Sequence, residues 1–244
     1  MGFESLYVAI NTATVFFVGA AGLTQSRNMG MFLLQLVLMV GLSLLLYSWL
    51  LTSRRNNMHA MLLVGIVIGG GLGSVATFMQ RMLTPSEFDV LTARLFGSVS
   101  NAETAYYPIA IPLVIVVTVL MFLNSRRLNV LALGRDAATN LGVSHKANAI
   151  YTLILVSILM ATTTALVGPM TFLGFLVATL AYQAAETYDH RFLFPMAMAT
   201  AFAVLTSAYF LMQHVFYAQG VVSIIIELVG GSVFLFVILR KGKL

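Results

Sequence analysis

The chain has 244 residues, of which 60% are hydrophobic and only 9% are charged. Soluble domains carry about 25% charged residues, so this composition excludes an ordinary soluble domain and predicts a polytopic membrane protein. The absence of cysteine excludes disulfides, thiolate metal sites and a cysteine nucleophile, and the formal net charge of +5 comes from short basic clusters that indicate membrane topology rather than binding to nucleic acid.

Apolar stretches follow one another along the whole chain. A helix needs about 20 apolar residues to cross a hydrocarbon layer of about 30 Å, and eight stretches meet or nearly meet this length. We therefore expect one all-α transmembrane bundle over residues 1–244, with about eight spans. The expected spans are residues 4–23, 31–52, 58–80, 107–124, 147–167, 169–186, 193–215 and 219–239, and two more polar segments, residues 85–103 and 128–142, are expected to be interfacial helices.

Glycine and proline interrupt two of these stretches. Gly168 and Pro169 separate the fifth from the sixth span and predict either a broken or a re-entrant helix. The third span contains a glycine cluster that includes Gly69 and Gly70 but lacks the lysine of a phosphate-binding loop. These glycines either let neighbouring helices approach closely or belong to a flexible span that lines a pathway.

Lys and Arg are distributed unevenly between the loops on the two sides of the membrane. Ten fall on one side and three on the other, so the first side is predicted to be cytosolic, together with both termini. Residues 85–103 then lie on the outer face, where Ser98 is expected to be accessible, and Ser144 is cytosolic. The ten residues are Arg54, Arg55, Arg126, Arg127, Arg135, Lys146, Arg191, Arg240, Lys241 and Lys243, and the three are Arg27, Arg81 and Arg94.

Few side chains are candidates for chemistry. The four histidines fall in different segments, without the i, i+4 spacing of a helical metal site, so no metal is expected. No nucleophile is paired with a base at a readable spacing, so no catalytic residue is predicted. Glu227 lies inside the last span, where an ionisable group is costly unless it has a partner. It either lines a translocation path or subunit contact, or it clamps adjacent helices by hydrogen bonding.

The segment from Asn129 to Lys146 predicts a short cytosolic helix. Asp136 falls in its first turn, where a carboxylate complements the helix dipole, and Gly142 suits the C-terminal cap. Ala137, Ala138 and Leu141 are expected to form a small apolar face that docks on a partner. An ordinary capped loop helix remains the alternative.

This segment, followed by the apolar stretch from Gly168 to Gln183 and by Asp189-His190-Arg191, resembles the FecCD-type permeases of ABC importers for iron-siderophore complexes, haem and cobalamin. The final helix, around residues 223–231, is more similar to the petrobactin and vibriobactin branch than to the cobalamin branch. The resemblance implies that residues 134–143 form the coupling helix that contacts the ATPase. The implied coupling residues are Gly134, Arg135, Asp136, Ala137, Ala138, Leu141 and Gly142, and residues of the translocation path or subunit contact are expected to be Glu227, Gly69, Gly70, Gly168 and Pro169.

The same resemblance implies the setting of the protein. It implies a bacterial inner-membrane permease subunit without cofactor, whose partners are an ATP-binding subunit, a second permease subunit in a homo- or heterodimer, and an extracytoplasmic siderophore-binding protein. The chain opens at what resembles the third helix of the family, so about two spans are expected to be missing. It also has Ala178-Thr179 where one branch has Pro-His, and its last outer loop, residues 217–219, lacks basic residues.

A rival hypothesis from another class is a stand-alone secondary transporter driven by an ion gradient. Glu227 would then be the coupling carboxylate. Association with an ATPase distinguishes the two hypotheses.

Overall fold

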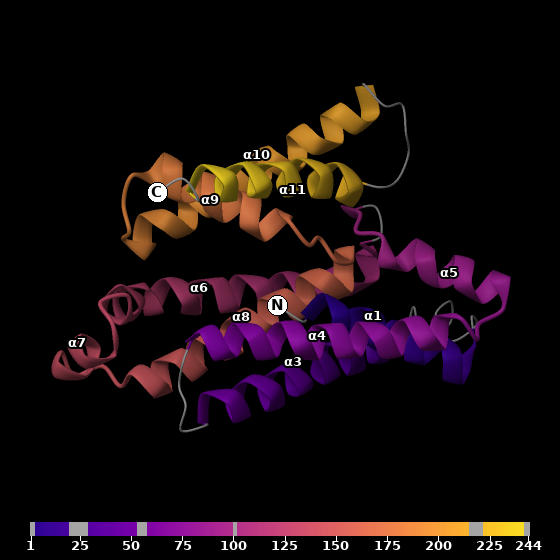
Figure 1. Cartoon of the computed structure of the whole chain (residues 1–244), viewed down its shortest axis with the longest axis horizontal. Coiled ribbons are helices and arrows are strands. Elements are labelled where there is room, and N and C mark those ends of the chain that lie inside the picture. The colour runs from indigo at the N-terminus through magenta and orange to yellow at the C-terminus, as the bar shows by residue number, and fades with distance from the viewer. Residues whose placement is uncertain (1–2, 20–28, 53–57, 100–101, 215–221, 242–244) are drawn as a thin grey trace. The chain divides into compact units, whose positions relative to one another are not determined.

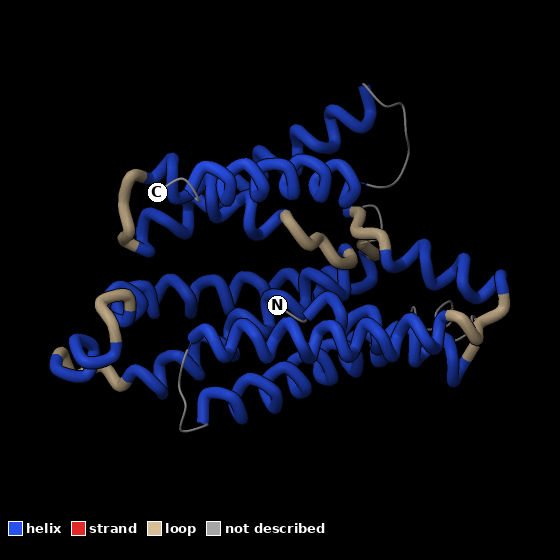
Figure 2. The backbone as a smooth tube through the Cα atoms, in the orientation of Figure 1, coloured by secondary structure: helices blue, strands red, loops and turns tan. Residues whose placement is uncertain are grey.

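The computed structural model describes residues 3–19, 29–52, 58–99, 102–214 and 222–241. Within these ranges the chain consists of helices and loops (Figure 2). Long apolar runs without alternation favour helices, which satisfy all backbone hydrogen bonds internally in lipid. The helices are α1 (Phe3–Val18), α3 (Met29–Thr52), α4 (Met58–Gln80), α5 (Pro85–Leu95), the short 3-10 helix η2 (Thr104–Tyr106), α6 (Tyr107–Leu131), α7 (Arg135–Asn140), α8 (His145–Val167), α9 (Leu173–Ala185), α10 (His190–His214) and α11 (Val222–Lys241) (Figure 1).

Each of the eight predicted spans coincides with an apolar helix in the described part of the chain. Four segments are long and apolar enough to cross a membrane, and the other four are shorter apolar helices. The all-α, membrane-spanning class is therefore confirmed. The four long segments are Leu63–Gln80, Thr104–Leu131, His145–Val167 and His190–His214, and the shorter ones are Glu4–Val18, Phe32–Leu45, Leu173–Ala185 and Val222–Phe236.

The structure corrects three boundaries. Helix α6 continues to Leu131, because no proline or glycine interrupts it after residue 124, so the predicted interfacial helix 128–142 shrinks to the six residues of α7. The segment 85–103, predicted to be one interfacial helix, is α-helical only to Leu95, and the backbone of Phe96 is extended. The sixth span is a helix of 13 residues, about 20 Å long, which is less than a full crossing requires.

Part of the predicted topology falls on residues outside the described ranges. They are Arg27, Arg54, Arg55, Lys243 and the loop 217–219, which is predicted to be an outer loop.

Residues 1–118 and 146–169 form the first of two compact units. Within it, α1 packs along α4, and α4 carries two buried glycines, Gly65 and Gly69, a residue type that favours close helix packing. Near the end of this contact the Gln80 side-chain amide donates a hydrogen bond of 3.1 Å to the Thr12 hydroxyl. Helix α5 packs on α1 through Leu91 and Val15, both of which are fully buried.

Helix α5 begins with a hydrogen-bonded cap. The Glu87 carboxylate accepts hydrogen bonds from the Thr84 backbone N–H at 3.0 Å and from its hydroxyl at 2.8 Å, and Pro85 occupies the first helical turn. These bonds lower the pKa of the Glu87 carboxyl, so the carboxylate stays ionised to a lower pH than an ordinary glutamate does.

Residues 119–145 and 170–244 form the second unit. Helices α9, α10 and α11 pack against one another in it (Figure 1). The core of this packing comes from Ala208 and Met212 of α10 and from Val222 and Ile226 of α11, with Leu173 of α9 against them.

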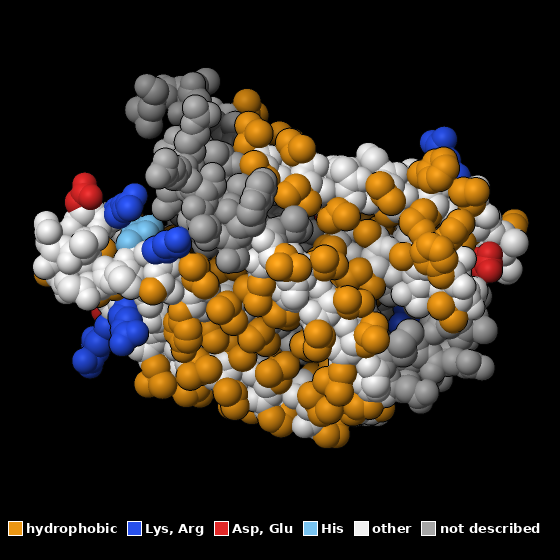
Figure 3. Space-filling view, turned by 90° about the horizontal axis from the view of Figure 1, so that it is seen from below, with side chains coloured by type: hydrophobic (Ala, Val, Ile, Leu, Met, Phe, Trp, Pro, Cys, Tyr) orange, Lys and Arg blue, Asp and Glu red, His pale blue; other side chains and the backbone are white. Residues whose placement is uncertain are grey.

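Large hydrophobic side chains remain exposed on many helices, among them Phe17, Leu123 and Phe202. Figure 3 shows a face on which hydrophobic side chains cover the middle and most visible charged side chains lie toward the ends. A soluble protein rarely exposes so much apolar surface, whereas lipid tails or a partner helix bury it without cost.

Candidate functional site

Helix α7 is the first candidate site, and it follows the end of α6 (Figure 1). Gly134 precedes the helix with φ of 97°, a backbone conformation that glycine adopts without strain. After the helix, the Gly142 N–H bonds to the Thr139 carbonyl at 3.0 Å and the Val143 N–H bonds to the Ala138 carbonyl at 2.9 Å. These two bonds and the positive φ of Gly142 make a Schellman motif, so the predicted glycine cap is present.

The apolar face expected on α7 is divided between two environments. Ala138 is fully buried within the chain, and Ala137 is half-buried. Leu141 is exposed, as are Arg135 and Asp136. A partner that docks on α7 therefore meets the two charged residues and Leu141, whereas Ala138 anchors the helix to its own chain.

A polar cluster connects the last turns of α6 to the start of α10. The Asn129 amide nitrogen donates to the Asp189 carboxylate at 2.7 Å, and the Asn129 oxygen accepts from the His190 backbone N–H at 3.0 Å. The His190 Nδ1 lies 2.6 Å from the same oxygen. The Asp189 carboxylate also accepts the Arg191 backbone N–H at 3.0 Å, and this bond, followed by that from Asn129, lowers the pKa of Asp189.

These residues belong to the segments that carry the family resemblance, but the sequence predicted no role for them. Asn129 and Asp189 are 60 residues apart, and no local pattern joins them. The available signal was the position of Asp189 four residues before the predicted span 193–215, in a region where an aspartate can cap the start of a helix.

Gly168 and Pro169 lie where α8 ends, and residues 168–172 are not helical, which confirms the predicted break. Gly168 is buried with φ of 91°, and a Cβ there would lie 3.1 Å from the Gly97 Cα. The Ser98 N–H also bonds to the Val167 carbonyl at 2.8 Å. Gly168 therefore permits a close backbone contact with the loop that follows α5.

Glu227 is the sixth residue of α11, and none of the described residues buries its side chain, which is exposed. Its carboxylate accepts a hydrogen bond of 3.3 Å from the hydroxyl of Thr171, in the turn before α9. One turn further, Gly230 approaches Phe172 so closely that a Cβ would lie 2.6 Å from the Phe172 Cβ. Glu227 thus has a partner on a neighbouring segment, as the clamp interpretation expects, while its exposure leaves the pathway interpretation open.

The two glycines of the third span have different surroundings. Gly69 is buried, which fits close helix packing. Gly70 is exposed, and a Cβ added there would meet nothing within 4 Å. The structure thus does not bring Gly69 and Gly70 to one surface.

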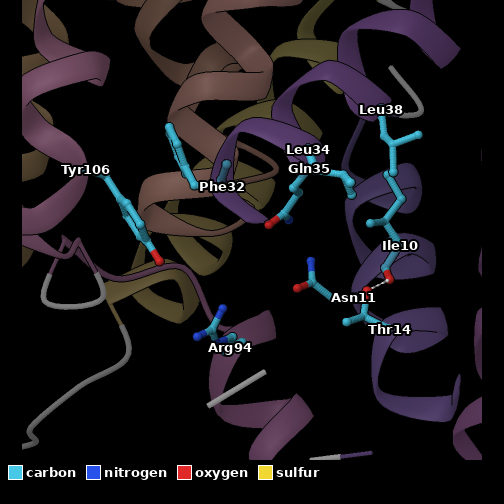
Figure 4. Close-up of a pocket in the computed structure, with 10 residues that line it drawn as sticks. Ile10, Asn11, Thr14, Phe32, Leu34, Gln35, Leu38, Arg94 and Tyr106 are labelled. Atoms are coloured by element: carbon cyan, nitrogen blue, oxygen red, sulfur yellow. Dashed lines mark hydrogen bonds between the residues drawn. The ribbon is translucent and has the colours of Figure 1, made fainter. Parts of the chain in front are cut away.

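A small pocket of mixed polar and apolar lining lies in the first unit (Figure 4). Its volume is about 60 Å³, enough for a few water molecules and far too small for a metal chelate. The Gln35 amide nitrogen is buried there and meets no acceptor among the described residues. The polar lining consists of Asn11, Thr14, Gln35, Arg94 and Tyr106.

Comparison with known proteins gives matches over the whole chain. The chain is 62% identical to the petrobactin import system permease protein FatC of Bacillus anthracis, over 100% of this chain and 69% of the relative. It is 33% identical to the petrobactin import system permease protein YclO of Bacillus subtilis, over 100% of this chain and 77% of that protein. The hemin transport system permease protein HmuU of Yersinia pestis is 29% identical over 78% of this chain and 57% of its own length.

The fold also matches a solved structure, an inward-facing conformation of a proposed metal-chelate type ABC transporter. The TM-score is 0.82, with 18% sequence identity, and the match covers 98% of this chain and 75% of the other. The sequence pattern of the FecCD transport family matches residues 1–240. The order of the helices, the capped α7 and these matches agree, and the chain belongs to the FecCD transport family.

Proposed function

We propose that this chain is a permease subunit of an ABC importer that moves an iron-siderophore complex into the cell. The observation that carries the proposal is its 62% identity, over its full length, to a petrobactin import permease. Ferric petrobactin is accordingly the first substrate to test.

The proposed partners are an ATP-binding subunit, a second permease subunit and an extracytoplasmic binding protein. The ATP-binding subunit hydrolyses ATP, and the permease itself carries no catalytic residue. The ATPase docks on α7, a helix of only six residues that exposes Arg135 and Asp136 and is followed by the exposed C-cap residue Leu141. A short helix with a fixed cap has few internal degrees of freedom, so it can transmit a displacement that the ATPase imposes on it.

We place the translocation path at the interface with the second permease subunit. The cavity inside the first unit is too small for a chelate, and large apolar side chains on several helices are exposed for a further helix to cover. The proposed location is the bacterial inner membrane, with both termini and α7 in the cytosol.

The test is uptake of iron-55 as ferric petrobactin by right-side-out vesicles that contain the chain, the second permease subunit and the ATPase, with ATP enclosed in the lumen and the binding protein added outside. We expect uptake that requires ATP on the cytosolic side and stops when the ATPase is inactivated. Uptake that follows an imposed pH gradient without ATP, and is lost in Glu227→Gln, would instead establish the secondary-transporter alternative.

A further inference from the structure

The cluster of Asn129, Asp189 and His190 joins the end of α6, which leads into α7, to the start of α10. We propose that this cluster, here called the α6–α10 clamp, makes the end of α6 and the start of α10 move as one body, so that a displacement of α7 reaches α10. Asn129 and Asp189 are then positioning residues for coupling. The inference rests on the proposed function, because it requires an ATPase that displaces α7.

The connection from the clamp to α7 is short and hydrogen-bonded. Asn129 lies two residues before the end of α6, and α7 begins at Arg135. The intervening turn keeps its own backbone bonds, from the Leu133 N–H to the Val130 carbonyl at 3.2 Å and from the Gly134 N–H to the Leu131 carbonyl at 3.1 Å. A displacement of α7 therefore also displaces Asn129, because the connection between them is a hydrogen-bonded turn and not a flexible loop.

On the other side, the clamp holds the first turn of α10. The Asp189 carbonyl accepts the N–H groups of Phe192 and Leu193, both at 3.0 Å, while its carboxylate accepts the Arg191 N–H. Asp189 thus belongs to the hydrogen-bond system of a helix of 25 residues. A force on its carboxylate acts on the helix end as a whole.

An aromatic contact fixes the same two helices at a second level. The rings of Phe122 in α6 and Phe194 in α10 lie edge to face, with centroids 5.5 Å apart. The His190 ring also lies 5.6 Å from Phe194. Phe122 is two helical turns before Asn129, so α6 and α10 contact each other at two separate levels.

The clamp needs one amide and one carboxylate. Asn129 donates through its nitrogen to a carboxylate and accepts through its oxygen from the start of α10, and no other side chain of that length does both. Aspartate at position 129 would place two carboxylates 2.7 Å apart. Exchanging the two side chains restores the pattern, because the amide, now at position 189, donates to the carboxylate at position 129, which still accepts the His190 N–H.

The experiment measures uptake and ATP hydrolysis together, in proteoliposomes that contain the chain with its ATPase, second permease subunit and binding protein. We expect Asn129→Asp to bind the ATPase and hydrolyse ATP but to import about tenfold less ferric petrobactin per ATP. The double variant Asn129→Asp with Asp189→Asn should recover to within about twofold of the native ratio. Asp89→Asn, on the exposed face of α5, is the matched control and should change nothing.

Equal uptake per ATP in Asn129→Asp and the native chain would overturn the inference, as would a failure of the double variant to recover. Loss of ATPase binding in Asn129→Asp would also overturn it, because the cluster would then only support α7. A native complex without ATP-dependent uptake would refute the proposed function instead, and it would be recognised before any variant is compared.

A second measurement needs no clamp variant and therefore does not depend on whether one folds. The chain has no cysteine, so single cysteines at the exposed positions Leu133 and Tyr188 accept spin labels selectively. We expect one narrow distance distribution between the labels, with the same centre in the ATP-bound and nucleotide-free complexes. A centre that shifts with nucleotide would show that the two helix ends move independently and would overturn the inference.

Discussion

At the scale of single residues, Gly168 has a backbone conformation and a neighbour that both require glycine. We expect Gly168→Ala to destabilise the chain by about 1–2 kcal/mol from the left-handed backbone alone, and by more because its Cβ would crowd the Gly97 Cα. Thermal unfolding of the purified chain in detergent measures this loss. Gly174→Ala is the matched control, because it lies in α9 with nothing within 4 Å of the added Cβ, and its unfolding temperature should not fall.

Glu227 and Thr171 allow the two interpretations of this carboxylate to be separated. If Glu227 acts as a helix clamp, Thr171→Val removes the donor and should lower thermal stability and uptake as much as Glu227→Leu does, by about 0.5–1.5 kcal/mol in stability. Glu227→Gln keeps an acceptor and should retain ATP-dependent uptake. A chain in which Glu227→Leu abolishes uptake while Thr171→Val is normal would assign Glu227 to the path or to the subunit contact.

At the scale of elements, burial on α7 decides which substitution tests docking. Leu141→Arg changes an exposed side chain and should reduce ATPase co-purification without lowering the unfolding temperature. Ala138→Arg forces a large charged side chain into a fully buried position and should destabilise the chain by about 1–3 kcal/mol or more. Unchanged ATPase binding in Leu141→Arg would contradict docking on this face.

Local sequence signals predicted the cap of α7 but not which of its side chains are buried. The glycine cap and the acidic first turn depend on residues within one or two helical turns, and both are present. Which alanine faces inward depends on the rotation of α7 about its axis, and packing on the rest of the chain sets that rotation.

At the scale of the whole molecule, the orientation in the membrane is open to a direct test. In the cysteine-free chain, Ser86→Cys on the exposed side of α5 should react with an impermeant thiol reagent applied outside the cell, and Ser144→Cys should react only after the inner membrane is opened. Ser98, which the sequence suggested as accessible, is buried and would give no labelling in either orientation. The opposite labelling of Ser86 and Ser144 would invert the proposed topology.

The sequence by itself determined the membrane class and the place of each apolar helix. These follow from hydrophobicity summed over about 20 residues and from local helix stops, which act without long-range contacts. The predicted break at Gly168 and Pro169 and the capped α7 are of the same local kind.

Only the tertiary structure decided which distant residues meet. Asn129 reaches Asp189, Thr171 reaches Glu227, and Gly168 lies against Gly97, each across more than one intervening element. Periodicity along one helix carries no information about such pairs in a chain that is apolar on all sides, because lipid and protein neighbours favour the same side chains. The side-chain geometry around α7 therefore emerged from packing, whereas the position of α7 along the chain was already present in the sequence.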